Sequence, residues 1–175
     1  MANTYTLIAS STVGSGGAAT FDFTSIPSTY TDLLLKCSTR QNGTASGYRL
    51  HLRFNNSLAS EYSSKELYYD NGTAYSGSGS SESYIRTAFV ENGAYTANTF
   101  NNVEIYIPNY LSSNYKSTSS DGVNENNATE NYLSLNAGLW SNTAAINRIT
   151  LSEYSGSGTI FAQYSTAYLY GIKNS

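Results

Sequence analysis

Apolar residues recur at every second position through much of this 175-residue chain, which is the period of a β-strand with one buried face. The clearest case is the segment 48–54. Its side chains alternate strictly, with Leu50, Leu52 and Phe54 on one side and Arg49, His51 and Arg53 on the other. A helix would scatter these residues around its axis, so the alternation predicts a strand.

The same pattern, together with short apolar runs, predicts a series of strands along the chain. They are expected at 5–10, 19–23, 33–40, 48–54, 84–90, 103–107, 132–139, 146–154 and 160–172, with one edge strand near 115–117. Gly14–Gly17 separates the first two segments, which are expected to pair as a hairpin. The turn signals between the last three strands include 155–158.

This spacing predicts an all-β fold in a single domain over 1–175, without a linker. An antiparallel two-sheet sandwich of jelly-roll type fits best, with about 8–10 strands and little or no helix. An immunoglobulin-type sandwich fits less well, because it needs fewer strands and often carries a Cys–Trp–Cys pattern that this sequence lacks.

The alternation weakens between residues 55 and 83, where we expect a long loop excursion with at most a single helical turn. Asn71–Gly72 and 76–81 have the composition of turns and loops. Loops of this length in compact domains usually serve function or an interface. Four tyrosines in this excursion favour a contact role: Tyr62, Tyr68, Tyr69 and Tyr75.

Composition narrows the function classes. Charged residues make up 12% of the chain, about half of the usual ~25%, whereas Ser, Thr, Asn and Gly supply 80 of the 175 residues. The many aromatics argue against disorder, and the scarcity of Glu and Lys argues against a helical bundle. No apolar run approaches the ~18 residues of a membrane span. The net charge of −3 disfavours a basic surface for nucleic acid, so neither membrane nor nucleic acid is an expected partner.

Residues able to carry chemistry are few. The single cysteine, Cys37, lies in an apolar segment and is expected to be a buried, unreactive side chain. The only histidine, His51, sits between two arginines, which favours a surface or interface role over catalysis. Glu104 alternates with apolar neighbours and is expected to be exposed. The acidic segment 121–126 lacks the remaining ligands of a calcium loop.

Two further signatures argue against an enzyme. Gly14–Gly17 joins two strands and precedes no helix, so it forms no phosphate cradle. No Gly-x-Ser-x-Gly sequence marks a nucleophile on a strand-to-helix turn. We therefore expect no catalytic residue, no cofactor and no bound metal. The N-terminus lacks the basic and apolar regions of a secretory signal.

The 17 tyrosines are the most distinctive feature of the composition. Tyr combines a large apolar ring with a polar tip and therefore suits contact surfaces. In the last predicted strand, Tyr164, Tyr168 and Tyr170 share one face, and Phe161 and Leu169 share the other. Bulk on both faces predicts that this strand is covered on both sides, either by core packing or by a subunit interface.

Several stretches resemble small virion structural proteins of tailed phages, especially phages of cyanobacteria and other aquatic bacteria. These stretches are 5–19, 26–35, 53–56, 107–110, 138–140, 145–147 and 167–172. The resemblance extends over nearly the whole chain and includes no catalytic motif. It implies a jelly-roll-like β domain that is part of the virion, either on the capsid or in the tail.

The leading hypothesis is a capsid decoration (cement) protein, a homotrimer that binds the capsid exterior across subunits of the phage major capsid protein. The alternative is a tail-fibre or receptor-binding domain that contacts host surface glycans, and a free glycan-binding module or hydrolase ranks below both. Contacts with neighbours are expected at two places. These are the N-terminal strand, with Tyr5, Leu7 and Ile8, and the 55–83 excursion, with Tyr62, Tyr68, Tyr69 and Tyr75.

Overall fold

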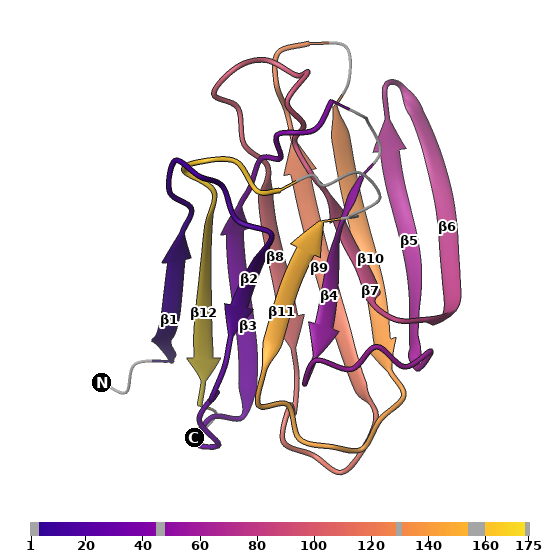
Figure 1. Ribbon diagram of the computed structural model, residues 1–175. Helices are drawn as coiled ribbons and strands as arrows, with labels where there is room; N and C mark the ends of the chain where they lie inside the picture. The colour runs from indigo at the N-terminus through magenta and orange to yellow at the C-terminus, as the bar shows by residue number, and fades with distance from the viewer. Residues whose placement is uncertain (1–3, 45–47, 129–130, 154–159, 174–175) are drawn as a thin grey trace.

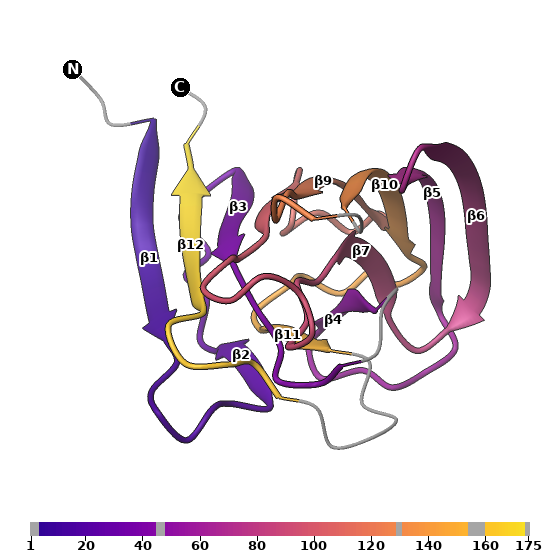
Figure 2. The same ribbon diagram turned by 90° about the horizontal axis from the view of Figure 1, so that it is seen from above.

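The computed structural model describes residues 4–44, 48–128, 131–153 and 160–173, which form two antiparallel β-sheets and no helix (Figure 1). Seen from above, the two sheets lie in two layers with the core between them (Figure 2). The expected all-β, two-sheet antiparallel sandwich is therefore confirmed. The described residues contain twelve strands rather than eight to ten.

Eight strands form the large sheet. Their spatial order is β1 (Tyr5–Thr12), β12 (Thr166–Ile172), β3 (Asp32–Ser38), β8 (Asn102–Ile107), β9 (Lys116–Asn124), β10 (Tyr132–Trp140), β5 (Tyr62–Asp70) and β6 (Thr73–Glu82). Four strands form the small sheet, in the order β2 (Thr20–Phe23), β11 (Ile149–Glu153), β4 (Arg49–Phe54) and β7 (Ile85–Phe89).

The core lies where the small sheet covers the large one. From the large sheet, Leu35 and Ile105 point inward, and from the small sheet Leu52 and Leu151 do the same, all without solvent exposure. Alternation explains this arrangement, because each of these residues sits on the apolar side of its strand. Trp140 packs at the same core, against the rings of Phe54 and Tyr62.

The expected loop at 55–83 is wrong, because most of this segment is a β-hairpin made by β5 and β6. Asn71 and Gly72 join the strands with φ angles of 47° and 94°, which both lie in the left-handed region. Two such residues make the type I′ turn that best fits a two-residue hairpin. Strand β6 is the last strand of the sheet and is largely exposed, so it buries no apolar face. Its Ser- and Gly-rich sequence therefore lacks the apolar alternation that predicts a strand.

Two other expectations about strands are wrong. The predicted edge strand near 115–117 is the nine-residue β9, which lies between β8 and β10 inside the large sheet. The segments 5–10 and 19–23 do not pair with each other. Strand β1 pairs with β12 in the large sheet, and β2 pairs with β11 in the small sheet.

The turn at Gly14–Gly17 thus connects the two sheets instead of closing a hairpin, with the Gly17 amide donating to the Gly14 carbonyl at 3.0 Å. Alternation indicates which face of a strand is buried, but it does not indicate which strand lies beside it. Strand β11 begins at Ile149 and β12 at Thr166, later than expected. The turn expected at 155–158 and residue Tyr154 lie outside the described residues.

Candidate functional site

The neighbouring strands β9, β10 and β5 turn apolar side chains away from the sandwich interior. On β10, Leu133 and Leu135 are 52% and 59% exposed, whereas the adjacent Ser134 and Asn136 are buried. A sheet with one face on a core normally buries its apolar set and exposes its polar set. The polarity of this part of the large sheet is therefore inverted.

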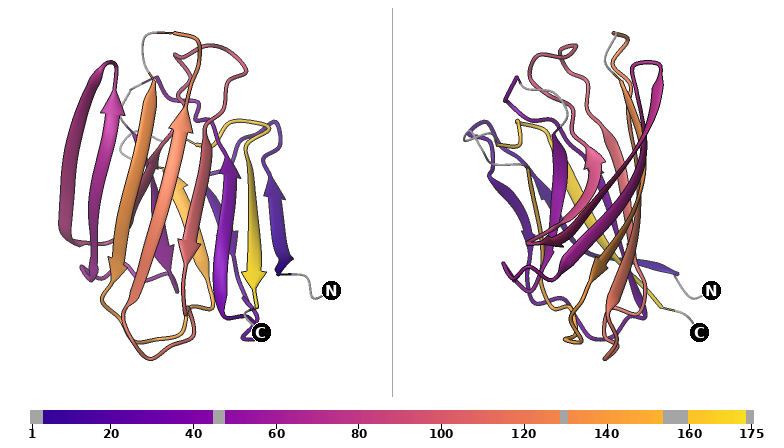
Figure 3. Two further views of the ribbon diagram at one scale, coloured as in Figure 1. Left: turned by 180° about the vertical axis from the view of Figure 1, so that it is seen from behind. Right: turned by 90° about the vertical axis from the view of Figure 1, so that its right-hand side faces the viewer.

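The exposed apolar residues of these three strands form one continuous surface. Leu135 lies opposite Leu67 of β5, which is 61% exposed, and Leu133 lies between Tyr69 of β5 and Val123 of β9. We call Leu67, Tyr69, Val123, Leu133 and Leu135 the outer apolar face. It lies over β9, β10 and β5, on the side of the large sheet that faces away from the small sheet; the left panel of Figure 3 shows these strands from that side. Contiguous exposed apolar surface of this kind marks interaction sites.

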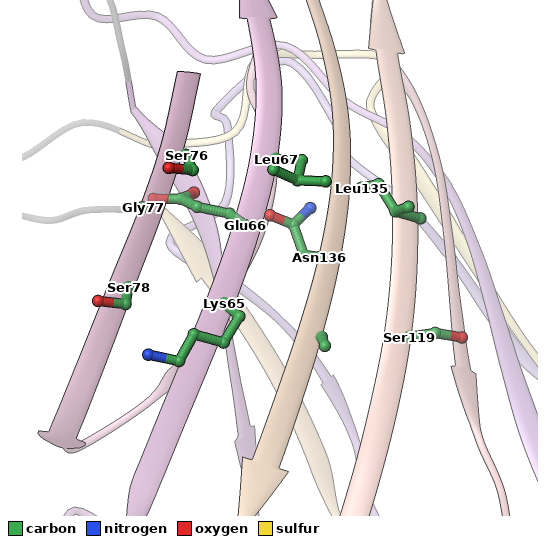
Figure 4. A pocket seen from close by; sticks show the side chains of 10 residues that line it. Lys65, Glu66, Leu67, Ser76, Gly77, Ser78, Ser119, Leu135 and Asn136 are labelled. Carbon is green, nitrogen blue, oxygen red and sulfur yellow. The ribbon is translucent and has the colours of Figure 1, made fainter. Parts of the chain in front are cut away.

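Two open depressions follow the outer apolar face. The larger has a volume of about 780 Å³, and its wall includes Leu67 and Leu135 from adjacent strands together with Lys65, Ser76, Ser78 and Ser119 (Figure 4). The smaller, of about 420 Å³, lies over Tyr69, Val123 and Leu133. An apolar floor with short polar side chains around it suits contact with another protein surface.

Charge on this side of the sheet is sparse and balanced. Lys65 on β5 and Asp121 on β9 are exposed, and neither forms an ion pair within the described part of the chain. Glu104 on β8 lies opposite Asp121 and pairs with Lys36 at 2.8 Å. The expectation that Glu104 is a solvated surface residue agrees with this half-exposed pair.

The inner side of the same strands is polar and closely packed. Small residues let the sheets approach, since a Cβ at Gly122 would overlap Ala88 and one at Gly138 would overlap Ile85 of β7. Asn136 is buried on this side, and neither atom of its amide has a hydrogen-bond partner among the described residues. Around Gly122, Gly138 and Asn136 the interior therefore buries little apolar area, although the same strands expose apolar side chains on their other side.

An ionic cluster fixes the β5–β6 hairpin beneath the outer apolar face. Arg49 of β4 donates to Glu66 of β5 at 2.6 Å, and its guanidinium lies 4.1 Å from the Phe89 ring centroid. Arg86 of β7 bonds to Glu82 of β6 and approaches Glu66 at 3.9 Å. Because Glu66 is buried, its pair with Arg49 is shielded from solvent, and the partly exposed Arg86–Glu82 pair adds a second tie between the hairpin and the small sheet.

The structure separates the tyrosines predicted to form one contact site. Tyr62 is 1% exposed and its hydroxyl bonds to the Phe54 backbone, so its expected contact role is wrong. Tyr68 and Tyr75 stack on each other at 5.2 Å on the inner side of the hairpin. Tyr69 alone among the four belongs to the outer apolar face.

The N-terminal residues lie at the opposite edge of the large sheet. Tyr5 and Leu7 are both more than half exposed, and Leu7 lies opposite Tyr170 of β12. Ile8 is half-buried and packs against the core. Tyr168 of β12 is also exposed, so core packing does not cover this face of the strand, and its coverage by a subunit interface stays a prediction.

The candidates for chemistry are buried. His51 is expected at the surface but is largely buried, stacked on Tyr84 at 3.5 Å between ring centroids. Burial lowers the pKa of His51 to about 3, and the charges of Arg53 and Arg86 add to the effect, so the imidazole is neutral at pH 7. Burial raises the pKa of the Cys37 thiol to about 12, in agreement with its expected buried place in the core.

The residues that matter most on this surface were not singled out by the sequence pattern. Leu133 and Leu135 belong to an alternating segment, but alternation cannot tell which of the two faces is inside. Leu67 and Val123 lie in segments whose apolar alternation is weak. The sequence offers one clue in Ser134 and Asn136, which alternate with the leucines of β10. Both are buried although such polar residues are unusual in a core. Only the packing of β7 against β9 and β10 reveals that they face inward.

In the residues that the structure describes, no group of three or more His, Cys, Asp or Glu side chains is placed to hold a metal ion. Those residues also contain no helix long and apolar enough to cross a membrane. Comparison with protein-family models and with curated proteins found no match to this chain.

Proposed function

We propose that this protein is a structural subunit that works by docking, and that it serves as a capsid decoration (cement) protein of a tailed phage. It would bind the outside of the head across neighbouring major capsid protein subunits. The observation that carries the proposal is the inverted polarity of β9 and β10, with Leu133 and Leu135 outside and Ser134 and Asn136 inside.

Docking would bury apolar side chains that the isolated chain leaves in water. Exposed Leu and Val side chains gain about 25 cal/mol for each Å² that a partner removes from water. The five residues of the outer apolar face lie on a sheet held by complete strand pairing on both sides of β10, so docking orders little further backbone. The few charges around them lower the desolvation cost of contact.

The surface also suits a repetitive lattice. A decoration protein adds contact area between neighbouring capsomers, and each copy can bind modestly while the assembled head gains by multivalency. The resemblance of the chain to virion structural proteins favours this role among docking functions. Ser, Thr and Asn, which carry no charge, make up 66 of the 175 residues, and where they lie at the surface they allow copies to lie close together.

The test is incorporation into particles. Wild-type protein should be found on purified heads at a copy number that matches the capsomers, and cryo-EM should place it outside the shell. The double variant Leu133→Asp, Leu135→Asp should fold normally, by circular dichroism, but be lost from the heads. Leu58→Asp is the matched control, because Leu58 is 71% exposed and belongs to the connection between β4 and β5, not to a strand of the outer apolar face.

Three results would overturn the proposal. Absence of the protein from purified virions would remove the structural role altogether. A few copies at the tail would indicate the fibre alternative instead. Retention of the double Asp variant on heads would show that the outer apolar face is not the docking surface.

A further inference from the structure

One cation and one anion lie beside the outer apolar face, on the same side of the sheet. Lys65 lies on β5 and Asp121 on β9, with β10 between them, and they occupy neighbouring rows of the sheet. Leu67 and Leu135 separate the two charges, since Leu67 follows Lys65 on the same face and Leu135 lies opposite Asp121. Figure 4 shows Lys65 and the two leucines along this part of the surface.

Such an arrangement is complementary to itself. A two-fold axis between two copies exchanges the ends of a contact patch, so residue i of one copy meets residue j of the other and the reverse also holds. Placed over the Leu67–Leu135 centre, that axis brings Lys65 of each copy to Asp121 of its partner. The leucines of the two copies then pack together, as the inner faces of paired sheets do about 10 Å apart.

The charges around the outer apolar face favour a second copy of this chain as the partner and disfavour a strongly acidic or basic protein. Among the residues that the structure describes, the charged strand partner of Asp121 is Glu104, which Lys36 already neutralises at 2.8 Å. The face therefore has no excess of either sign to attract a strongly charged surface. A partner with one cation, one anion and an apolar centre fits, and a second copy has all three.

We propose that the outer apolar face pairs with the same face of a second copy in a two-fold homodimer, with reciprocal Lys65–Asp121 contacts across a leucine-rich centre. The inference rests on the proposed function in one respect, namely that this face is a docking surface. It names a second copy as the occupant, so that copies on the head would pair through this face, and loss of the Leu133→Asp, Leu135→Asp variant from heads would follow from loss of that pairing.

The test measures self-association of the full chain by sedimentation equilibrium. Wild-type protein should be a dimer, and Leu135→Asp should be a monomer. Lys65→Asp and Asp121→Lys should each raise the dissociation constant about tenfold, because each substitution turns two symmetry-related attractions across the axis into repulsions. The double swap Lys65→Asp, Asp121→Lys should recover most of the wild-type affinity.

Rescue by the double swap is the decisive result, because only a reciprocal contact brings the two positions together. Lys173→Asp is the matched control, since it makes the same charge change at an exposed site on another strand end and should leave the dimer intact. Failure of the double swap to recover affinity, or a wild-type homotrimer, would overturn the two-fold pairing.

The outcomes also separate this inference from the proposed function. A monomeric wild type whose Leu133→Asp, Leu135→Asp variant is lost from phage heads would overturn the homodimer and leave docking to the capsid in place. A rescued dimer that is absent from virions would support the homodimer and overturn the decoration role.

Discussion

The large sheet contains two halves that follow opposite rules. In the β3 half, made by β12, β3 and β8, Leu35 and Ile105 point inward without exposure, and the Lys36–Glu104 pair lies outside. In the middle of the β10 half, made by β9, β10 and β5, leucines such as Leu135 lie outside and polar residues such as Asn136 point inward, while Trp140 reaches the core at the end of β10. One sheet thus buries its apolar face against its own chain in one half and leaves it uncovered in the other.

The small sheet explains the difference. Strands β2, β11 and β4 bring large apolar residues such as Phe21 and Leu52 to the common core. Strand β7, the end of the small sheet, packs on β9 and β10 through Ala88 and Ile85, close above Gly122 and Gly138. Little space remains between the layers there. We infer that the β3 half stabilises the fold, whereas the β10 half keeps its apolar side chains for assembly.

The largest expected effect on stability comes from a comparison in which one leucine in each half is replaced by alanine. Leu35→Ala should lower the free energy of unfolding by about 2–5 kcal/mol, because it leaves a cavity in the core. Leu135→Ala should change it by about 0.5 kcal/mol or less, because the side chain is already in solvent. Urea denaturation at low protein concentration measures both, so that self-association does not contribute.

Equal losses for the two variants would break the comparison, since Leu135 would then be part of the core. Leu58→Ala supplies the reference for an exposed leucine outside the outer apolar face. At high protein concentration only Leu135→Ala should weaken association, which separates its role in assembly from its role in folding.

The β3 half was also the part that sequence predicted best. Strands β3 and β8 appear near their predicted positions because runs such as Leu33–Leu35 and Val103–Ile107 bury an apolar face, and burial is what alternation reports. Strand β4 was predicted for the same reason, although its polar side holds a buried His51 and not a surface one.

The β10 half was predicted less well. Strand β9, with the sequence KSTSSDGVN, has almost no apolar residues, because its inner face lies against β7 where only small side chains fit. Strand β6 is largely exposed, so its sequence does not alternate between apolar and polar residues. The candidate surface was predicted only at Tyr69, because tyrosine content indicated contact while the leucines beside it resembled core residues.

The next effect concerns the close approach of the layers in the β10 half. Gly138→Ala and Gly122→Ala should each lower the free energy of unfolding by about 1–3 kcal/mol, because the added Cβ overlaps Ile85 or Ala88. Gly14→Ala is the control, since its Cβ would meet nothing within 4 Å. Thermal unfolding of the three variants measures the difference. Equal melting temperatures would mean that β7 can shift outward and that the interior is not tightly closed.

The smallest effect tests the polar interior directly. Asn136→Leu should raise the free energy of unfolding by about 1 kcal/mol, because it replaces a buried amide that has no bonding partner among the described residues with an apolar side chain of the same branching. Asn102→Leu, on the exposed side of β8, should not stabilise the protein. Urea titration with an unchanged m-value gives the comparison. A stabilised Asn136→Leu protein would show that the β10 half accepts an apolar interior, so its polarity is not required by folding. A loss of stability would mean that the amide is bonded in the native protein, as to a bound water, and that this half depends on its polar interior.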